Sequence, residues 1–295
     1  MRCLAAAVAL ALALAGTAAC SGDEKGGATP RQSQSQSQGQ ATPQGTPAAR
    51  LADVTLPDQP GPLVDLITRQ VRAAGTVRAE NASTTAEGAK KVEEKISAQL
   101  RTGTRTPSAQ MTIVSQDPAD SGTTEAVVLD GTIYTRVDGE EQAPGKPWVR
   151  LSRKDAANPE LAPFAKMLTG LLDEIDGALA QMSTDTGLAL VRNGAFKGAP
   201  AEESFEGTRV RRFTGTTEAA KLAGSDRAFE ALSKVGMKEV AWMLWVDGKG
   251  LPRKFQTDYT TPQGMKGSQT VTYRSWGEPL IIQAPPAGKV HTIGA

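Results

Sequence analysis

Histidine, cysteine and aromatic residues are scarce in this chain of 295 residues, and their scarcity excludes several chemistries. His291 is the only histidine, Cys3 and Cys20 are the only cysteines, and aromatic residues make up 4% of the chain. A serine–histidine–aspartate triad would therefore have to use His291, close to the C-terminus. A zinc site would have to rely mainly on carboxylates, which is unusual.

The motifs of common hydrolases and nucleotide-binding proteins are also missing. The sequence has no Gly-x-Ser-x-Gly elbow, no Gly-x-x-x-x-Gly-Lys-Ser/Thr loop and no Gly-x-Gly-x-x-Gly turn between a strand and a helix. Asp173, Glu174 and Asp176 form the nearest carboxylate cluster, which is typical of a solvated helix face. We expect a protein that is not an enzyme and holds neither a metal nor a cofactor. A glycosidase stays open as the alternative, because its two carboxylates can lie far apart in sequence.

An excess of charge of one sign is missing as well. The chain has 33 Lys and Arg against 32 Asp and Glu, a net charge of +1. It therefore lacks the basic field that attracts nucleic acid or anionic lipid, and we expect no nucleic-acid partner.

The first twenty residues have the pattern of an export signal. Met1-Arg2 supplies one positive charge, the run from Leu4 to Ala15 is apolar, and small residues follow up to Ala19. A charged start, a short apolar run and small residues before the cut are typical of a secretory signal. The run is shorter than the roughly 20 residues that a membrane-spanning helix needs.

The end of this signal resembles the lipobox at which signal peptidase II cuts before a cysteine that is then acylated. The segment is Thr17-Ala18-Ala19-Cys20, in which Thr17 replaces the usual leucine. We predict cleavage after Ala19 and a lipid anchor on Cys20, with acyl chains such as palmitate, at the outer face of the cytoplasmic membrane. The mature chain would then have a single cysteine and no internal disulfide. The alternative is an ordinary secretory signal followed by an incidental cysteine.

Residues 20–59 read as a tether. They are rich in Ser, Gln, Gly and Pro and have almost no large apolar side chains, so they cannot bury enough surface to fold. A flexible coil of this length has a root-mean-square reach of roughly 35 Å. The sequence thus divides into a signal at 1–19, a lipidated tether at 20–59 and a folded domain at 60–295.

The folded domain begins with a helical stripe and continues mostly in strands. Apolar residues from Leu63 to Val71 recur at helical spacing up to Gly75. Asp130-Gly131 separates two short alternating runs and predicts a tight hairpin turn. The remaining predicted strands are 77–84, 92–101, 110–115, 125–129, 132–137, 148–151, 201–214, 240–246, 251–259 and 268–276.

Two helical segments interrupt these strands. Residues 158–182 carry apolar side chains at three- and four-residue steps, with Gly170 and Gly177 as candidate bends. Ser225 is a candidate N-cap of a short helix that reaches Val235. Sequential strands without regular helical crossovers favour an antiparallel sheet. We therefore predict an α+β fold, in which helices lie across the concave face of a curved antiparallel sheet, a half-barrel.

The C-terminal part resembles a known family. Trp245–Lys254 is a tryptophan strand, a glycine turn and a strand opening with Leu-Pro-Arg; Val271–Leu280 ends in Trp-Gly-Glu-Pro, and Gln283–Pro286 is an Ala-Pro-Pro tail. This pattern is similar to the signature of the actinobacterial LppX/LprAFG-type lipoproteins. Arg253 follows Pro252 directly, which is a minor departure from that signature.

The resemblance implies a LolA-like half-barrel with an apolar cavity between sheet and helices. It implies an acylated lipid or glycolipid as ligand, the cell membrane as partner through the anchor, and a role in lipid transport through the envelope, with no particular transporter indicated. The candidate cavity residues are Met111, Ile113, Val127, Leu129 and Ile133 on strands, and Phe164, Leu168, Leu171, Leu172, Ile175 and Leu179 on the central helices.

The residues alone leave two alternatives open at this interface. The same apolar side chains can line a cavity or pack on one another in a closed core, and the resemblance favours the cavity. A protein-interaction or sensor lipoprotein with the same fold and no bound lipid is the other function that fits. Trp242 and Trp245 are three positions apart, so a regular strand sends them to opposite faces of the sheet.

Overall fold

The computed structural model describes residues 51–102, 108–117, 120–222 and 237–293. The predicted signal, Cys20 and most of the predicted tether lie outside the described residues. The short helix predicted from Ser225 to Val235 lies outside them too.

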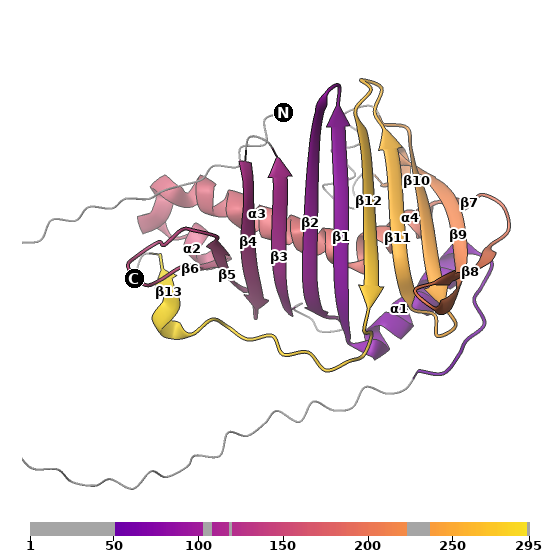
Figure 1. The fold of residues 1–295 in the computed structure, drawn as a ribbon, viewed down its shortest axis with the longest axis horizontal. Helices are drawn as coiled ribbons and strands as arrows, with labels where there is room; N and C mark the ends of the chain where they lie inside the picture. Colours follow the sequence, from indigo (N-terminus) through magenta and orange to yellow (C-terminus); the bar gives the residue numbers. More distant parts are fainter. Residues whose placement is uncertain (1–50, 103–107, 118–119, 223–236, 294–295) are drawn as a thin grey trace, which may run out of the picture. The chain divides into compact units, whose positions relative to one another are not determined.

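The described residues form one curved, open sheet of thirteen strands, with helices across one of its faces (Figure 1). Their order is β13-β6-β5-β4-β3-β2-β1-β12-β11-β10-β9-β7, and β8 pairs with β9. All pairings are antiparallel except that of β13 with β6, so the predicted fold class is confirmed. The strands are β1 (Thr76–Glu87), β2 (Lys90–Arg101), β3 (Ser108–Asp117), β4 (Asp120–Leu129), β5 (Thr132–Val137), β6 (Trp148–Ser152), β7 (Ala195–Phe196), β8 (Ala201–Phe205), β9 (Thr208–Glu218), β10 (Glu239–Asp247), β11 (Pro252–Thr260), β12 (Lys266–Arg274) and β13 (Val290–Thr292).

Alternation of side chains gives the sheet a helix-covered face and an outer face. In β1, Val77, Ala79 and Asn81 are buried, while Arg78 and Glu80 between them are exposed. Successive side chains of a strand point to opposite faces, so the buried set marks the helix-covered face.

Three longer helices supply the cover. They are α1 (Pro60–Ala74), α3 (Ala165–Met182) and α4 (Thr184–Asn193); α2 (Arg153–Ala156) and the 3₁₀ turn η1 (Pro159–Phe164) precede α3. In Figure 1, α3 passes behind the central strands, and α1 and α4 lie toward the β9 edge. Gly170 and Gly177 do not interrupt α3. The sequence did not predict α4. Its N-cap is Ser183, whose hydroxyl accepts from the Asp185 amide.

Local sequence signals explain where several elements begin and end. Pro60 opens α1, where a missing N–H costs nothing, and Gly75 ends it with φ +73°. Asp130 and Gly131 both have positive φ, and Leu129 pairs with Thr132, so the predicted two-residue hairpin turn is confirmed.

The two tryptophans of β10 lie on opposite faces, as the spacing predicts. Trp242 is buried under the helices, and its indole N–H donates to Thr217 Oγ1 at 2.9 Å. Trp245 lies on the outer face, where its indole N–H donates to Glu203 Oε2 at 2.9 Å. The Lys254 ammonium lies 4.4 Å from the Trp245 ring centroid, so the outer tryptophan is covered by polar neighbours.

The two halves of the C-terminal sequence signature meet in space. The Trp276 indole N–H donates to the Pro252 carbonyl at 2.7 Å. Asp247 Oδ1 accepts from the amides of Lys249 and Leu251 at 2.9 and 3.0 Å, which closes the glycine turn. These contacts give the signature a structural role at one end of β10–β12.

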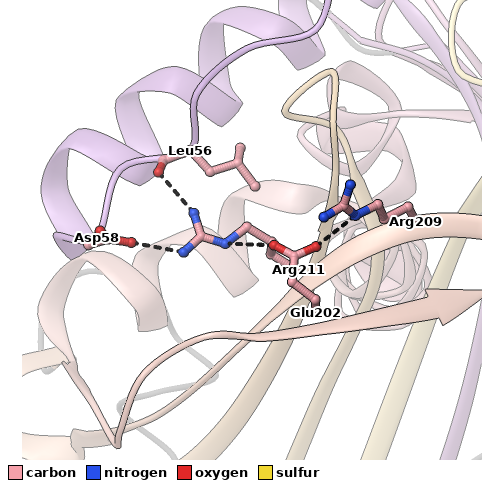
Figure 2. Close-up of polar contacts among 5 residues, drawn as sticks. All are labelled: Leu56, Asp58, Glu202, Arg209 and Arg211. Carbon is pink, nitrogen blue, oxygen red and sulfur yellow. Dashed lines mark hydrogen bonds and ion pairs between the residues drawn. The ribbon is translucent and has the colours of Figure 1, made fainter.

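The segment before α1 is held against the sheet by Arg211 of β9. Figure 2 shows its guanidinium donating to the Leu56 carbonyl at 3.2 Å and to Asp58 Oδ1 at 3.0 Å. Glu202 of β8 pairs with Arg211 at 3.5 Å and with Arg209 at 3.0 Å. The Val54 amide also donates to Gly248 O at 2.7 Å, so the chain enters the domain beside the β10–β11 turn.

Candidate functional site: the interface between helices and sheet

An apolar stripe of α3 packs on the sheet. Leu168, Leu172, Ile175 and Met182 are each at most 3% exposed, and they recur at three-, four- and seven-residue steps. Helical spacing puts such residues on one side of the helix. α3 contacts β1, β2 and β6, while α4 contacts β9 and α1.

Three of the strand residues predicted to line the cavity lie on the face of the sheet that the helices cover. Met111 lies between Ala98 and Ala126 in the register of β2, β3 and β4, and all three are buried. Ile113 and Ile133 are also buried and belong to the same apolar core. The structure therefore brings Met111, Ile113 and Ile133 together with the predicted helix residues.

Val127 and Leu129 are not part of this group. Val127 pairs with Gln110, whereas Ala126 and Val128 pair with Met111 and Ala109 on the helix-covered face. A strand alternates with a period of two, so Val127 and Leu129 point to the outer face. Ala126 and Val128 occupy the helix-facing positions that the sequence analysis predicted for Val127 and Leu129.

The remaining predicted helix residues divide into two groups. Leu171 and Leu179 are partly buried and pack against the core, beside the fully buried Leu172 and Ile175. The side chain of Phe164 lies outside the described residues, although its backbone ends η1.

α4 is closely packed on the sheet. A void of about 10 Å³ lies between α4 and the sheet, among Gly187, Leu188, Leu244, Phe255 and neighbouring side chains. That volume suits about one water molecule and no acyl chain. An acyl chain could enter at this place only by separating α4 from the sheet.

A larger hollow, of about 410 Å³, lies over β1, β12, β11 and β10. It is an open groove whose lining is mostly small or polar, with Thr84, Ser268 and Thr260 beside Asp258 and Lys266. The register puts Thr84 and Ser268 opposite each other on the outer face, away from the apolar stripe. This groove is therefore separate from the apolar layer between α3 and the sheet.

Polar groups border the apolar interface where α3 crosses β1 and β2. Asn81 is 2% exposed, and its Nδ2 donates to Gln181 Oε1 of α3 at 2.9 Å. Within the described part of the chain, Asn81 Oδ1 has no donor. Glu94 of β2 is half-buried, and burial, followed by the charge of Glu174 on α3, raises its pKa.

The sequence analysis missed this polar border. Asn81 follows Val77 and Ala79 at two-residue spacing, so its inward direction was readable from the strand pattern. Its partner Gln181 comes from a helix one hundred residues away, which no local pattern indicates.

Two kinds of feature were sought among the described residues: clusters of metal-ligating side chains and helices that could cross a membrane. Among the described residues, no cluster of three or more metal-ligating side chains occurs. No helix in that part of the chain is both long and apolar enough to cross a membrane. The fold and the interface define a helix-covered open sheet with an apolar contact layer and a polar border.

Comparison with known proteins yields likeness at the level of fold. Neither a scan against protein-family models nor a search of curated proteins found a match. The chain is similar to the crystal structure of LprF from Mycobacterium bovis, with 14% identity and a TM-score of 0.47 over 76% of this chain and 95% of that one. It is also similar to the Mycobacterium tuberculosis lipoprotein LppX, with 13% identity and a TM-score of 0.44 over 75% of this chain and 98% of that one.

At these sequence identities and TM-scores, the likeness concerns the fold alone. The function proposed below therefore rests on the residues of this chain.

Proposed function

We propose that this chain is an extracytoplasmic lipoprotein, anchored through Cys20, that binds the acyl part of a lipid between α3 and the sheet. The observation that carries the proposal is the apolar stripe of α3, which lies as a separate layer on an open sheet. Buried residues on both sides, such as Ile175 and Met111, offer an apolar environment on each side of an inserted chain.

The energy of such binding comes from removing methylene groups from water. Each buried CH₂ contributes about 0.8 kcal/mol. Two sixteen-carbon chains contribute on the order of 25 kcal/mol before the costs of ordering the chains and displacing α3 are subtracted. The ligand replaces the helix–sheet contacts that it disrupts with contacts to its own chains.

α3 is the helix whose displacement such binding requires. α4 is tied to α1 by the pair Arg192–Asp65 at 2.5 Å, and its Leu190 carbonyl accepts from Thr217 of β9 at 2.7 Å. α3 is linked to the sheet through Asn81 and Gln181, and to α2 through the pairing of Asp173 and Asp176 with Arg153. Ser183 separates the two helices, so α3 can tilt about this residue while α4 stays in place.

A second function is favoured by the small void at the interface. With about 10 Å³ between α4 and the sheet, the helices and sheet also fit a permanently closed core. The chain would then be a protein-interaction or sensor lipoprotein that uses an outer surface and holds no lipid.

Mass spectrometry of the purified chain distinguishes these two functions. The chain carries Cys20→Ser, so that any extracted lipid is bound non-covalently. We expect near-stoichiometric lipid in the organic extract. Leu171→Trp, on the partly buried side of α3, is expected to lower the amount severalfold. Thr112→Trp, on the outer face of β3, is the matched control. A lipid-free chain that also takes up no added acyl probe would favour the interaction protein.

The anchor is tested separately by labelling cells with radioactive palmitate. We expect the unchanged chain to incorporate label and to remain with the membrane fraction. Cys20→Ser should lose the label and be released. Incorporation that persists in this variant would reject Cys20 as the acylated residue.

A further inference from the structure

The polar border of the helix–sheet interface is built mainly from hydrogen-bond acceptors. Asn81 and Glu94 lie on the same face of adjacent strands, because Asn81 pairs with Ile96 and Ser83 pairs with Glu94. Their side chains are therefore diagonal neighbours, within reach of one small polar group.

α3 contributes polar side chains next to Asn81 and Glu94. Glu174 and Gln181 are seven residues apart, two helical turns, so they lie along one side of α3. Gln181 contacts Asn81 at 2.9 Å, and the charge of Glu174 acts on Glu94. The strand pair and the helix thus face each other through the same cluster.

Asn81 has an unusual position within this cluster. It is 98% buried, its Nδ2 is occupied by Gln181, and its Oδ1 lacks a donor within the described residues. A buried acceptor without a donor is costly, so a ligand that donates a hydrogen bond there gains more than it would at an exposed position. The two nearby carboxylates disfavour an anionic group at the same place.

We propose that Asn81, Glu94 and Glu174 form a head-group position that selects a neutral amphiphile with a hydroxyl-rich head over one with an anionic head. This inference rests on the proposed function, because the tail of the amphiphile occupies the apolar layer between α3 and the sheet. The hydroxyls donate to Asn81 Oδ1 and to the carboxylates, and the tail continues toward Met111 and Ile175.

Two probes with the same tail test this selection. Dodecyl maltoside and dodecyl phosphate are titrated below their micelle concentrations into the Cys20→Ser chain by calorimetry. We expect the maltoside to bind about tenfold more tightly, the ratio given by one hydrogen bond to a charged or buried group. Glu94→Gln should reduce this preference at least about threefold by strengthening phosphate binding. Asn81→Leu should weaken maltoside binding about tenfold and leave phosphate binding unchanged.

Glu93→Gln is the matched control, because Glu93 is the neighbouring carboxylate of β2 on the outer face, paired with Lys91. It should leave both affinities unchanged. Equal affinity of the two probes, or a ratio that Glu94→Gln does not alter, would overturn the head-group assignment alone. Failure of both probes to bind would overturn the proposed lipid binding and this inference with it.

Discussion

The indole of Trp242 in β10 lies directly over the backbone of Gly215 in β9. A Cβ atom at position 215 would overlap the ring and lie 2.6 Å from the Ala195 carbonyl oxygen. Both residues are buried, and β9 and β10 pair them directly across the strands. Position 215 therefore has room for glycine alone while Trp242 keeps its place.

Gly215→Ala should lower the free energy of unfolding by about 1–3 kcal/mol, because a buried site without spare volume must distort to take a methyl group. Chemical denaturation followed by tryptophan fluorescence measures the change. Gly122→Ala in β4 is the control, because nothing lies within 4 Å of its added Cβ. An unchanged unfolding midpoint for Gly215→Ala would contradict the close contact with Trp242.

Glu94 should make the stability of the protein fall as pH rises. Its pKa is raised above the ordinary value of 4.5, first by burial and then by Glu174, so the folded state binds this proton more tightly than the unfolded state. Stability is fully retained below pH 4.5 and decreases as pH rises through the higher pKa of the folded state. Glu94→Gln should therefore be more stable than the unchanged chain at pH 7.5 and should lose this part of the pH dependence.

The pKa of the neighbouring Glu93 shifts in the opposite direction, so Glu93 serves as the comparison. Its hydrogen bond with Lys91 lowers its pKa, and it lies on the solvated outer face. Glu93→Gln should not stabilise the protein at pH 7.5. Denaturation curves at pH 4.5 and 7.5 for both variants measure the difference, and equal pH profiles would reject the assigned environment of Glu94.

Thr135→Val should leave the protein as stable as before or stabilise it by up to about 1–2 kcal/mol. The Thr135 side chain is 4% exposed on β5, and its hydroxyl has no partner within the described residues. Valine has nearly the same shape and removes the desolvated hydroxyl. Thermal unfolding measures the effect, and a loss of more than about 2 kcal/mol would indicate that the hydroxyl has a partner in solution.

Arg211→Ala should release the segment at 51–58 from the sheet. The Arg211 guanidinium joins Leu56 and Asp58 to β9, as Figure 2 shows, so its loss leaves this segment with fewer contacts. Hydrogen exchange of the amides at 51–58 should become faster, while exchange in β3 and β4 stays unchanged. Arg209→Ala is the control, because the side chain of Arg209 is 84% exposed and pairs with Glu202 alone among the contacts in Figure 2. Equal exchange in the two variants would contradict the role given to Arg211.

Most strands and the fold class could be predicted because their signals are local, but the single strand predicted at 201–214 is the hairpin of β8 and β9, which turns at Glu206-Gly207. Alternation in Val77, Ala79 and Asn81, and the turn at Asp130-Gly131, depend on neighbouring residues only. β13 could not be found in this way, because its parallel pairing with β6 joins residues about 140 positions apart. α4 was missed because it is short and contains Gly187, which weakens its helical pattern.

The candidate site could be predicted only in part. The run Ala126–Leu129 is apolar at every position, so its sequence does not specify which residues face the helices, and the register with β3 decides. Whether apolar faces enclose a space or close on each other depends on side-chain packing across α3 and the sheet. The sequence identifies the residues of that layer, but it does not determine the distance between α3 and the sheet.

The contact of the segment 51–58 with the β10–β11 turn also determines where force enters the domain. Val54 bonds to Gly248, and Asp58 bonds to Arg211, before the chain turns into α1. In a chain held at its N-terminus, tension is therefore delivered to the β9–β11 end of the sheet. α3 contacts β1, β2 and β6, so tension that enters beside the β10–β11 turn reaches the sheet before it reaches this helix.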